Sequence, residues 1–410
     1  MANLYFVNRF FWPDTSATSQ LLTDLAESLA AAGHQVTVAA CRRRYQHADE
    51  LLPARETHAG VKIRRLRSSN FGRHSKPGRM LDYLSFYVSA IVDIACRCGR
   101  GDIVVVKTDP PLLGVPLAML GLIKGYRLVN WVQDLFPEVA ENAGIAVAKG
   151  PVGRVLKHLR DWSLRRAATN VVIGRQMEEA LADRGIPSSQ LTRITNWSLA
   201  PEQASSDTGL RRSWGLADRF VVMYSGNMGE AHDHETILGA MRRLADDDGI
   251  VFLFVGGGKR LSLLLDTAKQ EGLRHVAAQP LQPLERVAES LRVGDVHLIS
   301  LLPAFDTQIV PSKYYGILSA GRPALFIGSD ANDVAIEIRQ EGLGAVVAPG
   351  DDAALAALIL EARQRDQQRA EQGRRARSVY ERRYTRTASL GHWHRLVERL
   401  ASSASDKAAA

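Results

Sequence analysis

The chain has 410 residues, of which 46% are hydrophobic and 23% are charged, the composition of an ordinary globular protein with two or three domains. Three cysteines, Cys41, Cys96 and Cys98, are too few for a disulfide framework and lack the spacing of a zinc site. The net charge of +8 comes from residues 1–200, which carry 26 Lys and Arg against 17 Asp and Glu and so favour an anionic partner.

Nucleic acid and an anionic membrane surface are the two candidate partners of this basic half. The sequence shows no helix-turn-helix, zinc-finger or RNA-binding signature, so we expect a membrane surface and no nucleic acid. It shows no signal-peptide pattern, and no apolar stretch approaches the ~20 residues of a spanning helix. We therefore expect a cytoplasmic protein with reduced cysteines, peripheral on the inner face of the cell membrane.

Residues 1–200 alternate between strand and helix patterns, which is typical of an α/β domain with a parallel sheet. The expected strands are 4–10, 34–40, 61–66, 102–107, 127–133, 171–173 and 191–195. The expected helices are 16–32, 83–96, 116–124, 151–167 and 176–184. A polar loop with Arg42, Arg43 and Arg44 separates the second and third strands.

Two carboxylates, Asp134 and Glu138, follow the strand expected at 127–133. Open parallel sheets bind ligands at the carboxyl ends of their strands, so both residues are candidates for a ligand site. The alternative is a helix N-cap, where Asp is common.

The helix expected at 151–167 is basic and amphipathic. Its apolar residues at helical spacing are Val152, Val155, Leu156, Leu159 and Trp162. This composition is typical of a helix that lies on a membrane surface, and the alternative is a surface helix packed on its own sheet. We expect contacts with the membrane or the acceptor from Arg154, Lys157, Arg160, Trp162 and Arg165.

Residues 201–208 read as a linker, after which a second α/β alternation begins. Its expected strands are 220–224, 250–255, 276–278, 296–301, 324–327 and 345–347. Its expected helices are 235–244, 261–270, 284–293, a helix starting at Pro311, and 353–363. A charged helical stretch over 368–400 follows, and the small polar residues 401–410 are expected to be disordered.

Three joints between strand and helix in this second half suggest a phosphate site: residues 226–229, residues 256–258 and Pro311-Ser312-Lys313. Glycines allow backbone N–H groups to approach a phosphate, and a helix start with a lysine attracts an anion. The alternative for Lys313 is an ordinary surface lysine at such a joint. Neither the dinucleotide fingerprint nor a P-loop is present, which disfavours NAD and excludes a P-loop ATPase. His232 and His234 lack a third nearby ligand, so we expect no metal.

Motifs spread over nearly the whole chain form a recognisable set. They are Phe11-Trp12-Pro13, Gly33-His34-Gln35-Val36-Thr37-Val38, Gln133-Asp134-Leu135-Phe136-Pro137-Glu138, Ser225-Gly226-Asn227-Met228-Gly229, Phe254-Val255-Gly256-Gly257-Gly258 and Pro311-Ser312-Lys313 with Ala320-Gly321-Arg322-Pro323. Together they resemble the retaining family-4 glycosyltransferases of the GT-B fold. Within that family they are most similar to the bacterial branch that builds exopolysaccharide, capsule and O-antigen units, which includes fucosaminyltransferase-like members.

The resemblance implies two Rossmann-like parallel-sheet domains that face a cleft. The acceptor would bind residues 1–200 and the nucleotide-sugar residues 209–383, with a helix at 384–400 crossing back to the first domain. The implied catalytic residues are Lys313, Asp134, Glu138 and His232. The implied donor-binding residues are Gly226, Asn227, Gly229, Gly257, Gly258, Gln279, Gln308, Pro311, Ser312, Lys313, Tyr314 and Tyr315. No cofactor or metal is expected, because the nucleotide-sugar is itself the substrate.

The sequence departs from the family pattern at two positions. Many relatives carry two glutamates where this chain has Gln308 and Gly316, and the second glutamate usually contacts the ribose. We expect Tyr314, Tyr315 or backbone groups to replace that contact.

The resemblance predicts transfer of a sugar, with retention and more plausibly from a UDP-linked than a GDP-linked donor, to a polyprenyl-diphosphate-linked sugar. Two alternatives remain open at this point. One is a nucleotide-sugar 2-epimerase, and the other is a catalytically inactive binding partner, which the missing glutamates would suit.

Overall fold

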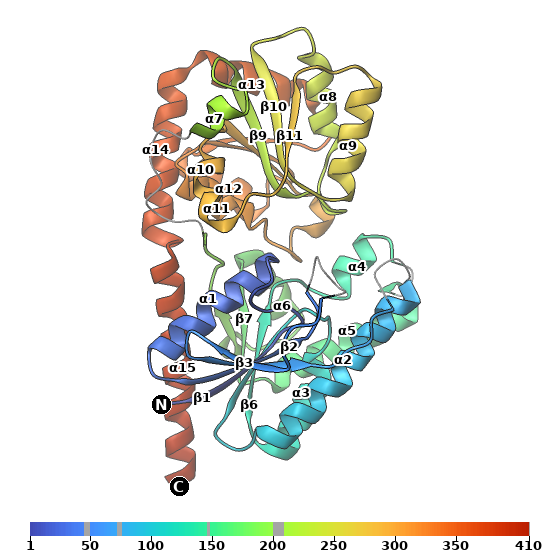
Figure 1. Cartoon of the computed structure of the whole chain (residues 1–410), viewed down its shortest axis with the longest axis vertical. Coiled ribbons are helices and arrows are strands. Elements are labelled where there is room, and N and C mark those ends of the chain that lie inside the picture. The colour runs from blue at the N-terminus through green and yellow to red at the C-terminus, as the bar shows by residue number, and fades with distance from the viewer. Residues whose placement is uncertain (45–49, 72–75, 146–147, 200–208, 410) are drawn as a thin grey trace. The chain divides into compact units, whose positions relative to one another are not determined.

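A computed structural model describes the chain except for residues 45–49, 72–75, 146–147, 200–208 and 410, and it divides into two compact units (Figure 1). Unit 1 comprises Met1–Thr195 and Thr387–Ala410, and unit 2 comprises Asn196–Arg386. The predicted linker at 201–208 lies outside the described residues. Each unit is built on its own α/β sheet, which confirms the predicted fold class.

Unit 1 contains an eight-stranded sheet in the order β3-β4-β2-β1-β5-β6-β7-β8. Its strands are β1 (Asn3–Val7), β2 (Gln35–Cys41), β3 (Arg55–His58), β4 (Val61–Leu66), β5 (Ile103–Lys107), β6 (Arg127–Val132), β7 (Thr169–Val172) and β8 (Leu191–Arg193). Its helices are α1 (Ala17–Ala31), α2 (Lys76–Arg97), α3 (Gly114–Lys124), α4 (Glu138–Asn142), α5 (Gly150–Arg166), α6 (Arg175–Asp183) and α15 (Arg386–Ala409).

The one departure from the predicted parallel sheet among the described strands is β3, which pairs antiparallel with β4 at the sheet edge. Its sequence, Arg-Glu-Thr-His, has no apolar alternation, so the sequence pattern predicts a loop there. By contrast, β5 is buried along its whole length, as a central parallel strand requires.

Helix α15 belongs to unit 1, where its Trp393 ring meets the Trp131 ring edge-on at a centroid distance of 4.7 Å. His394 also bonds the Ser28 hydroxyl at 2.9 Å. The helix continues to Ala409, so the prediction of a disordered tail at 401–410 was wrong for all but the last residue, which is not described. Alanine is the strongest helix former, and this alanine-rich stretch extends a helix that is already nucleated.

Unit 2 contains a six-stranded parallel sheet in the order β11-β10-β9-β12-β13-β14. Its strands are β9 (Phe220–Asn227), β10 (Ile250–Gly257), β11 (Val276–Gln279), β12 (Val296–Ser300), β13 (Ala324–Ile327) and β14 (Gly344–Val347). Its helices are α7 (Gly209–Ser213), α8 (Glu235–Arg243), α9 (Lys259–Gln270), α10 (Leu284–Leu291), α11 (Lys313–Ser319), α12 (Asp333–Glu341), α13 (Asp352–Gln364) and α14 (Asp366–Arg383).

The strand order of unit 2 reverses between β9 and β12, because β10 follows β9 on one side and β12 lies on the other. A parallel α/β sheet binds its ligand at the carboxyl ends of the strands that flank such a reversal. The segments after β9 and β12 are therefore the first place to look for a site. In this region α11 begins at Lys313, two residues later than the Pro311 start that we predicted.

Candidate active site

The carboxyl ends of β9 and β10 come unusually close together at their glycines. Gly226 pairs with Gly256 in the sheet, and their φ angles are 116° and 134°. A Cβ atom on Gly256 would lie 2.4 Å from the Gly226 carbonyl oxygen, so no other residue fits there. The result is an edge of bare backbone on β9 and β10, next to the strand reversal between β9 and β12.

Lys313 lies over this edge. Its Cε atom is 3.6 Å from the position that a Cβ atom on Gly226 would occupy. Its Nζ atom donates a hydrogen bond to the Tyr224 hydroxyl and lies 4.0 Å from the centroid of the same ring. Desolvation lowers the pKa of Lys313 to about 7, because the surrounding protein disfavours its charged form.

His232 joins the loop after β9 to the end of β12. Its Nδ1 atom is 2.5 Å from the Ser300 carbonyl oxygen, which can only accept, so Nδ1 carries the proton and Nε2 is the acceptor nitrogen. Desolvation and the nearby Lys313 charge lower the pKa of His232 to about 3. The imidazole is therefore neutral, so its Nε2 atom can accept a hydrogen bond from a hydroxyl group but brings no positive charge to a phosphate.

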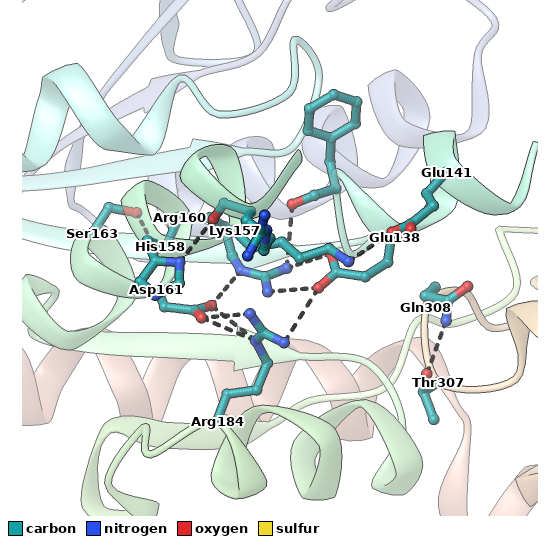
Figure 2. Close-up of polar contacts among 12 residues, drawn as sticks. Glu138, Glu141, Lys157, His158, Arg160, Asp161, Ser163, Arg184, Thr307 and Gln308 are labelled. Carbon is teal, nitrogen blue, oxygen red and sulfur yellow. Dashed lines mark hydrogen bonds and ion pairs between the residues drawn. The ribbon is translucent and has the colours of Figure 1, made fainter. Parts of the chain in front are cut away.

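The remaining predicted donor residues of unit 2 spread along the same edge. Asn227 ends β9 and its Nδ2 atom is 3.3 Å from the position of a Cβ atom on Gly229. Gly257 ends β10 and Gly258 is the N-cap of α9. Gln279 ends the edge strand β11, where it pairs with Val255. Ser312 is exposed before α11, and Pro311 is buried. Gln308 donates to the Thr307 hydroxyl at 3.1 Å (Figure 2).

Tyr314 is engaged within unit 2. Its hydroxyl donates to Glu337 at 2.7 Å, so Tyr314 is not the residue that replaces the missing ribose contact. Tyr315 is buried and its ring lies 5.0 Å from the Tyr384 ring. Gly316 lies against α10, since a Cβ atom there would be 3.1 Å from Cδ1 of Leu291.

In unit 1, Asp134 follows β6 and lines a small cavity of about 40 Å³ together with Lys107, Thr108 and Asn130. Asp134 is accessible to solvent, but many protein atoms lie close around its carboxylate and reduce its solvation. Desolvation and the charge of Asp109 raise the pKa of Asp134 to about 6. The cavity holds no more than a few water molecules, so a sugar could only contact its rim.

Lys107 ends β5 and is buried, with its Nζ atom 3.6 Å from the centroid of the Trp131 ring and 3.0 Å from the Thr18 carbonyl oxygen. Desolvation lowers its pKa to about 7, although the charges of Asp134 and Asp109 oppose that shift. Sequence reasoning missed Lys107, and the available signal was a lysine at the end of an otherwise apolar strand.

Glu138 does not present its carboxylate to a ligand. Its two oxygens accept from Arg160 at 2.9 and 3.0 Å, and Arg160 also bonds the Phe136 carbonyl oxygen at 3.2 Å and Asp161 at 2.7 Å (Figure 2). Arg184 closes the network by bonding Asp161 at 2.7 Å. These contacts hold α4 and the segment after β6 against α5, which indicates a positioning role for Glu138.

The predicted membrane residues of α5 divide into two groups. Arg154 and Arg165 are exposed, as a membrane contact requires. Arg160 is buried in the network described above, so its assignment to a membrane surface was wrong. Lys157 pairs with Glu141 at 2.6 Å, and Trp162 is half-buried against the core of unit 1.

Known proteins are similar to this chain in sequence and in fold. A family model of the glycosyl transferase 4-like domain matches residues 17–197. The probable glycosyltransferase WbjE of Pseudomonas aeruginosa is 29% identical over 318 residues, which cover 76% of this chain and 78% of that protein. WcaI of Escherichia coli strain K12, named for colanic acid biosynthesis, is 29% identical over 60% of this chain and 62% of its own.

Residues 17–197 thus match a glycosyl transferase 4-like domain, and the relatives support a glycosyltransferase that is similar to family 4. The solved structure of HepE from Anabaena in complex with UDP-glucose superimposes on this glycosyltransferase with a TM-score of 0.72, over 98% of this chain and all of the other. The two sequences are 15% identical, so this structural similarity supports the GT-B fold and not a shared activity.

Sequence reasoning found Lys313 in this glycosyltransferase but missed Tyr224, the residue that holds its ammonium. Tyr224 reads as one more apolar residue of a buried strand. Within the described part of the chain, no group of three or more His, Cys, Asp or Glu side chains is arranged to hold a metal. Among the described helices, none is both long enough and apolar enough to cross a membrane.

Proposed function

We propose that this glycosyltransferase moves a sugar from a UDP-linked donor to a polyprenyl-diphosphate-linked sugar during assembly of a bacterial cell-surface polysaccharide. The proposal includes retention of the anomeric configuration, no metal requirement, and action at the inner face of the cell membrane. WcaI, a relative named for colanic acid biosynthesis, supports the polysaccharide assignment. The HepE complexes with UDP and UDP-glucose support the choice of base.

The placement of Lys313 over Gly226 is the observation that carries the proposal. A diphosphate at the bare backbone edge of β9 and β10 would lie within reach of the ammonium and would face the N-terminus of α9, whose dipole favours an anion. Lys313 is half-buried and partly desolvated, so water would screen its charge only weakly. The charged lysine would therefore stabilise the negative charge that develops on the phosphate.

The chemical step breaks the bond between the anomeric carbon and the UDP oxygen, and that oxygen keeps the electron pair. The acceptor hydroxyl forms the new bond on the same face of the sugar and gives its proton to the departing phosphate. Lys313 stabilises the charge on the leaving group in this scheme. The neutral Nε2 atom of His232 would accept a hydrogen bond from a donor hydroxyl and so orient the sugar.

Unit 1 would hold the acceptor, with Asp134 as the residue that contacts its hydroxyl. The raised pKa of Asp134 makes the carboxylate a stronger acceptor than an ordinary Asp. Glu138 would act indirectly by positioning Asp134, because Arg160 links Glu138 to the backbone of the segment that carries Asp134.

Mass spectrometry of nucleotide-sugars incubated with the protein tests the proposal, with and without a bacterial lipid extract. We expect loss of a UDP-sugar and a matching mass gain in the lipid fraction. Release of a free epimer without lipid would identify a 2-epimerase instead. No turnover of any donor would identify a non-catalytic binding protein.

A further inference from the structure

Unit 1 exposes apolar side chains on three neighbouring helices, α2, α3 and α5. Helix α3 packs against both α2 and α5, and the ribbons lie side by side in Figure 1. Five large apolar side chains of α2, three of α3 and three of α5 are exposed. We call these eleven side chains the three-helix face.

Helix α2 is apolar on two opposite sides. Phe86, Ala90 and Ile94 recur every four residues and are buried in the core of unit 1. Leu84, Val88 and Val92 repeat at the same interval on the other side and are exposed. A helix on a solvent-facing surface needs only one apolar side to pack on its sheet, and the second side has no partner among the described residues of unit 1.

Helices α3 and α5 continue this face. Leu122 and Ile123 of α3 are 61% and 82% exposed, and Val152, Val155 and Leu159 of α5 are exposed at helical spacing. Unit 2 differs, since among its described residues only Leu263 and Leu281 are large, apolar and exposed. The concentration on one face of unit 1 is therefore a local feature, of the kind that marks an interaction surface.

The exposed charges of the three helices have one sign. The acidic residues of the three helices are Asp82, Asp93 and Asp161, and all three are buried. Asp93 is paired with Arg64 and Asp161 with Arg160. The basic residues Arg79, Arg154 and Arg165, in contrast, are exposed. The face is thus apolar and basic, which complements an anionic lipid surface.

We propose that the three-helix face docks on an anionic lipid bilayer, with its apolar side chains in the boundary between headgroups and acyl chains. Apolar contact and cationic side chains are the two elements of interfacial membrane binding. A second copy of this chain is a poorer occupant, because a two-fold interface would bring the same basic residues together. The choice of lipid over an acidic protein rests on the proposed function, since a lipid-linked acceptor places the reaction at a bilayer.

Vesicle sedimentation of the full chain tests this docking, with phosphatidylcholine vesicles that contain or lack phosphatidylglycerol. The face variant carries Leu122→Asp and Ile123→Asp, and its control carries Leu263→Asp and Leu281→Asp in unit 2. We expect the face variant to lose roughly tenfold or more in affinity for anionic vesicles, since two large apolar side chains leave the contact. The control should bind like the wild type.

A second pair of variants tests the charge. Arg154→Glu with Arg165→Glu should weaken binding to anionic vesicles at low salt, whereas Lys269→Glu with Arg274→Glu in unit 2 should not. Equal binding of the wild type to neutral and anionic vesicles would overturn the proposal. So would a face variant that binds like the wild type, or a solution dimer that dissociates in the face variant.

UDP titration of every variant without lipid separates this proposal from the proposed function. Lost vesicle binding with unchanged UDP binding supports the face as the docking surface. A wild type that consumes a UDP-sugar but ignores vesicles overturns the docking surface alone. A wild type that binds anionic vesicles through this face but neither binds nor consumes a nucleotide-sugar supports the docking surface and contradicts the proposed function.

Discussion

The Lys313 ammonium contacts the Tyr224 side chain in two ways: the nitrogen donates to the hydroxyl and also lies 4.0 Å from the ring centroid. Tyr224 is fully buried in β9, and Lys313 opens α11, so the contact ties two segments that are 89 residues apart. The ring and the hydroxyl both favour the charged lysine and so limit the fall in its pKa.

Replacing Tyr224 with phenylalanine should therefore lower the pKa of Lys313 below about 7. A hydrogen bond to a charged group is worth about 1.5–3 kcal/mol, so we expect UDP affinity at pH 8 to fall roughly tenfold or more. At pH 6 the loss should be smaller. Tyr314→Phe is the matched control, because its hydroxyl bonds Glu337 and should not affect UDP. Equal losses at both pH values would show that Tyr224 acts on UDP without changing the Lys313 charge.

UDP affinity of the wild type should fall as the pH rises above 7. Below its pKa of about 7, Lys313 is charged in the free protein, and above it the lysine must take up a proton before it can meet a diphosphate. The dissociation constant should then rise up to about tenfold per pH unit above pH 7. Calorimetry at pH 8 in buffers of different ionisation enthalpy should show proton uptake on binding. A pH-independent affinity from 7 to 9 would contradict this account.

Glu138→Gln should lower stability rather than act on the acceptor directly. The change removes the negative charge and one of the two oxygens that accept from the buried Arg160, and it leaves Asp161, so we expect a loss of about 1–3 kcal/mol in the free energy of unfolding. Thermal unfolding and the acceptor KM distinguish the two roles. A raised acceptor KM with unchanged thermal stability would restore Glu138 to the acceptor site.

The sequence was sufficient for the parallel sheets and for the joint that carries Lys313, because strong apolar strands and glycine-rich turns are local signals. It could not show which way Arg160 points. A basic amphipathic helix looks the same whether an arginine faces water or a carboxylate 22 residues earlier, as Glu138 is here. The apolar side of α2 was missed for a related reason: a helix that is apolar on two sides resembles a buried helix until its neighbours are known.

The antiparallel strand β3 and the helical tail show the opposite limitation. Each depends on a partner, β4 for the polar strand and the preceding turns of α15 for the tail, and its own residues carry a weak signal. Tyr224 was overlooked because an aromatic residue in a buried strand is usually core. Only its place beside Lys313 gives it a role.

Gly316→Glu tests how the ribose is held. The new Cβ atom would lie 3.1 Å from Cδ1 of Leu291, the end of a flexible side chain, so a small shift should accommodate it. If the site simply lacks the family's carboxylate, UDP affinity should increase by roughly tenfold, the value of one added hydrogen bond. Unchanged or weaker binding in a stably folded variant would indicate that other groups already satisfy the ribose hydroxyls.

The measurement that tests the central claim most directly is a calorimetric UDP titration of the wild type, Lys313→Ala and the control Lys269→Ala. We expect the wild type and the control to bind alike, and Lys313→Ala to bind about tenfold or more weakly, since a charge-assisted contact is lost. The same variant should lose on the order of 10²–10³ in kcat, the effect of removing one preorganised electrostatic contact. No UDP binding by the wild type, or a Lys313→Ala variant within about threefold of it in both affinity and kcat, would contradict the account.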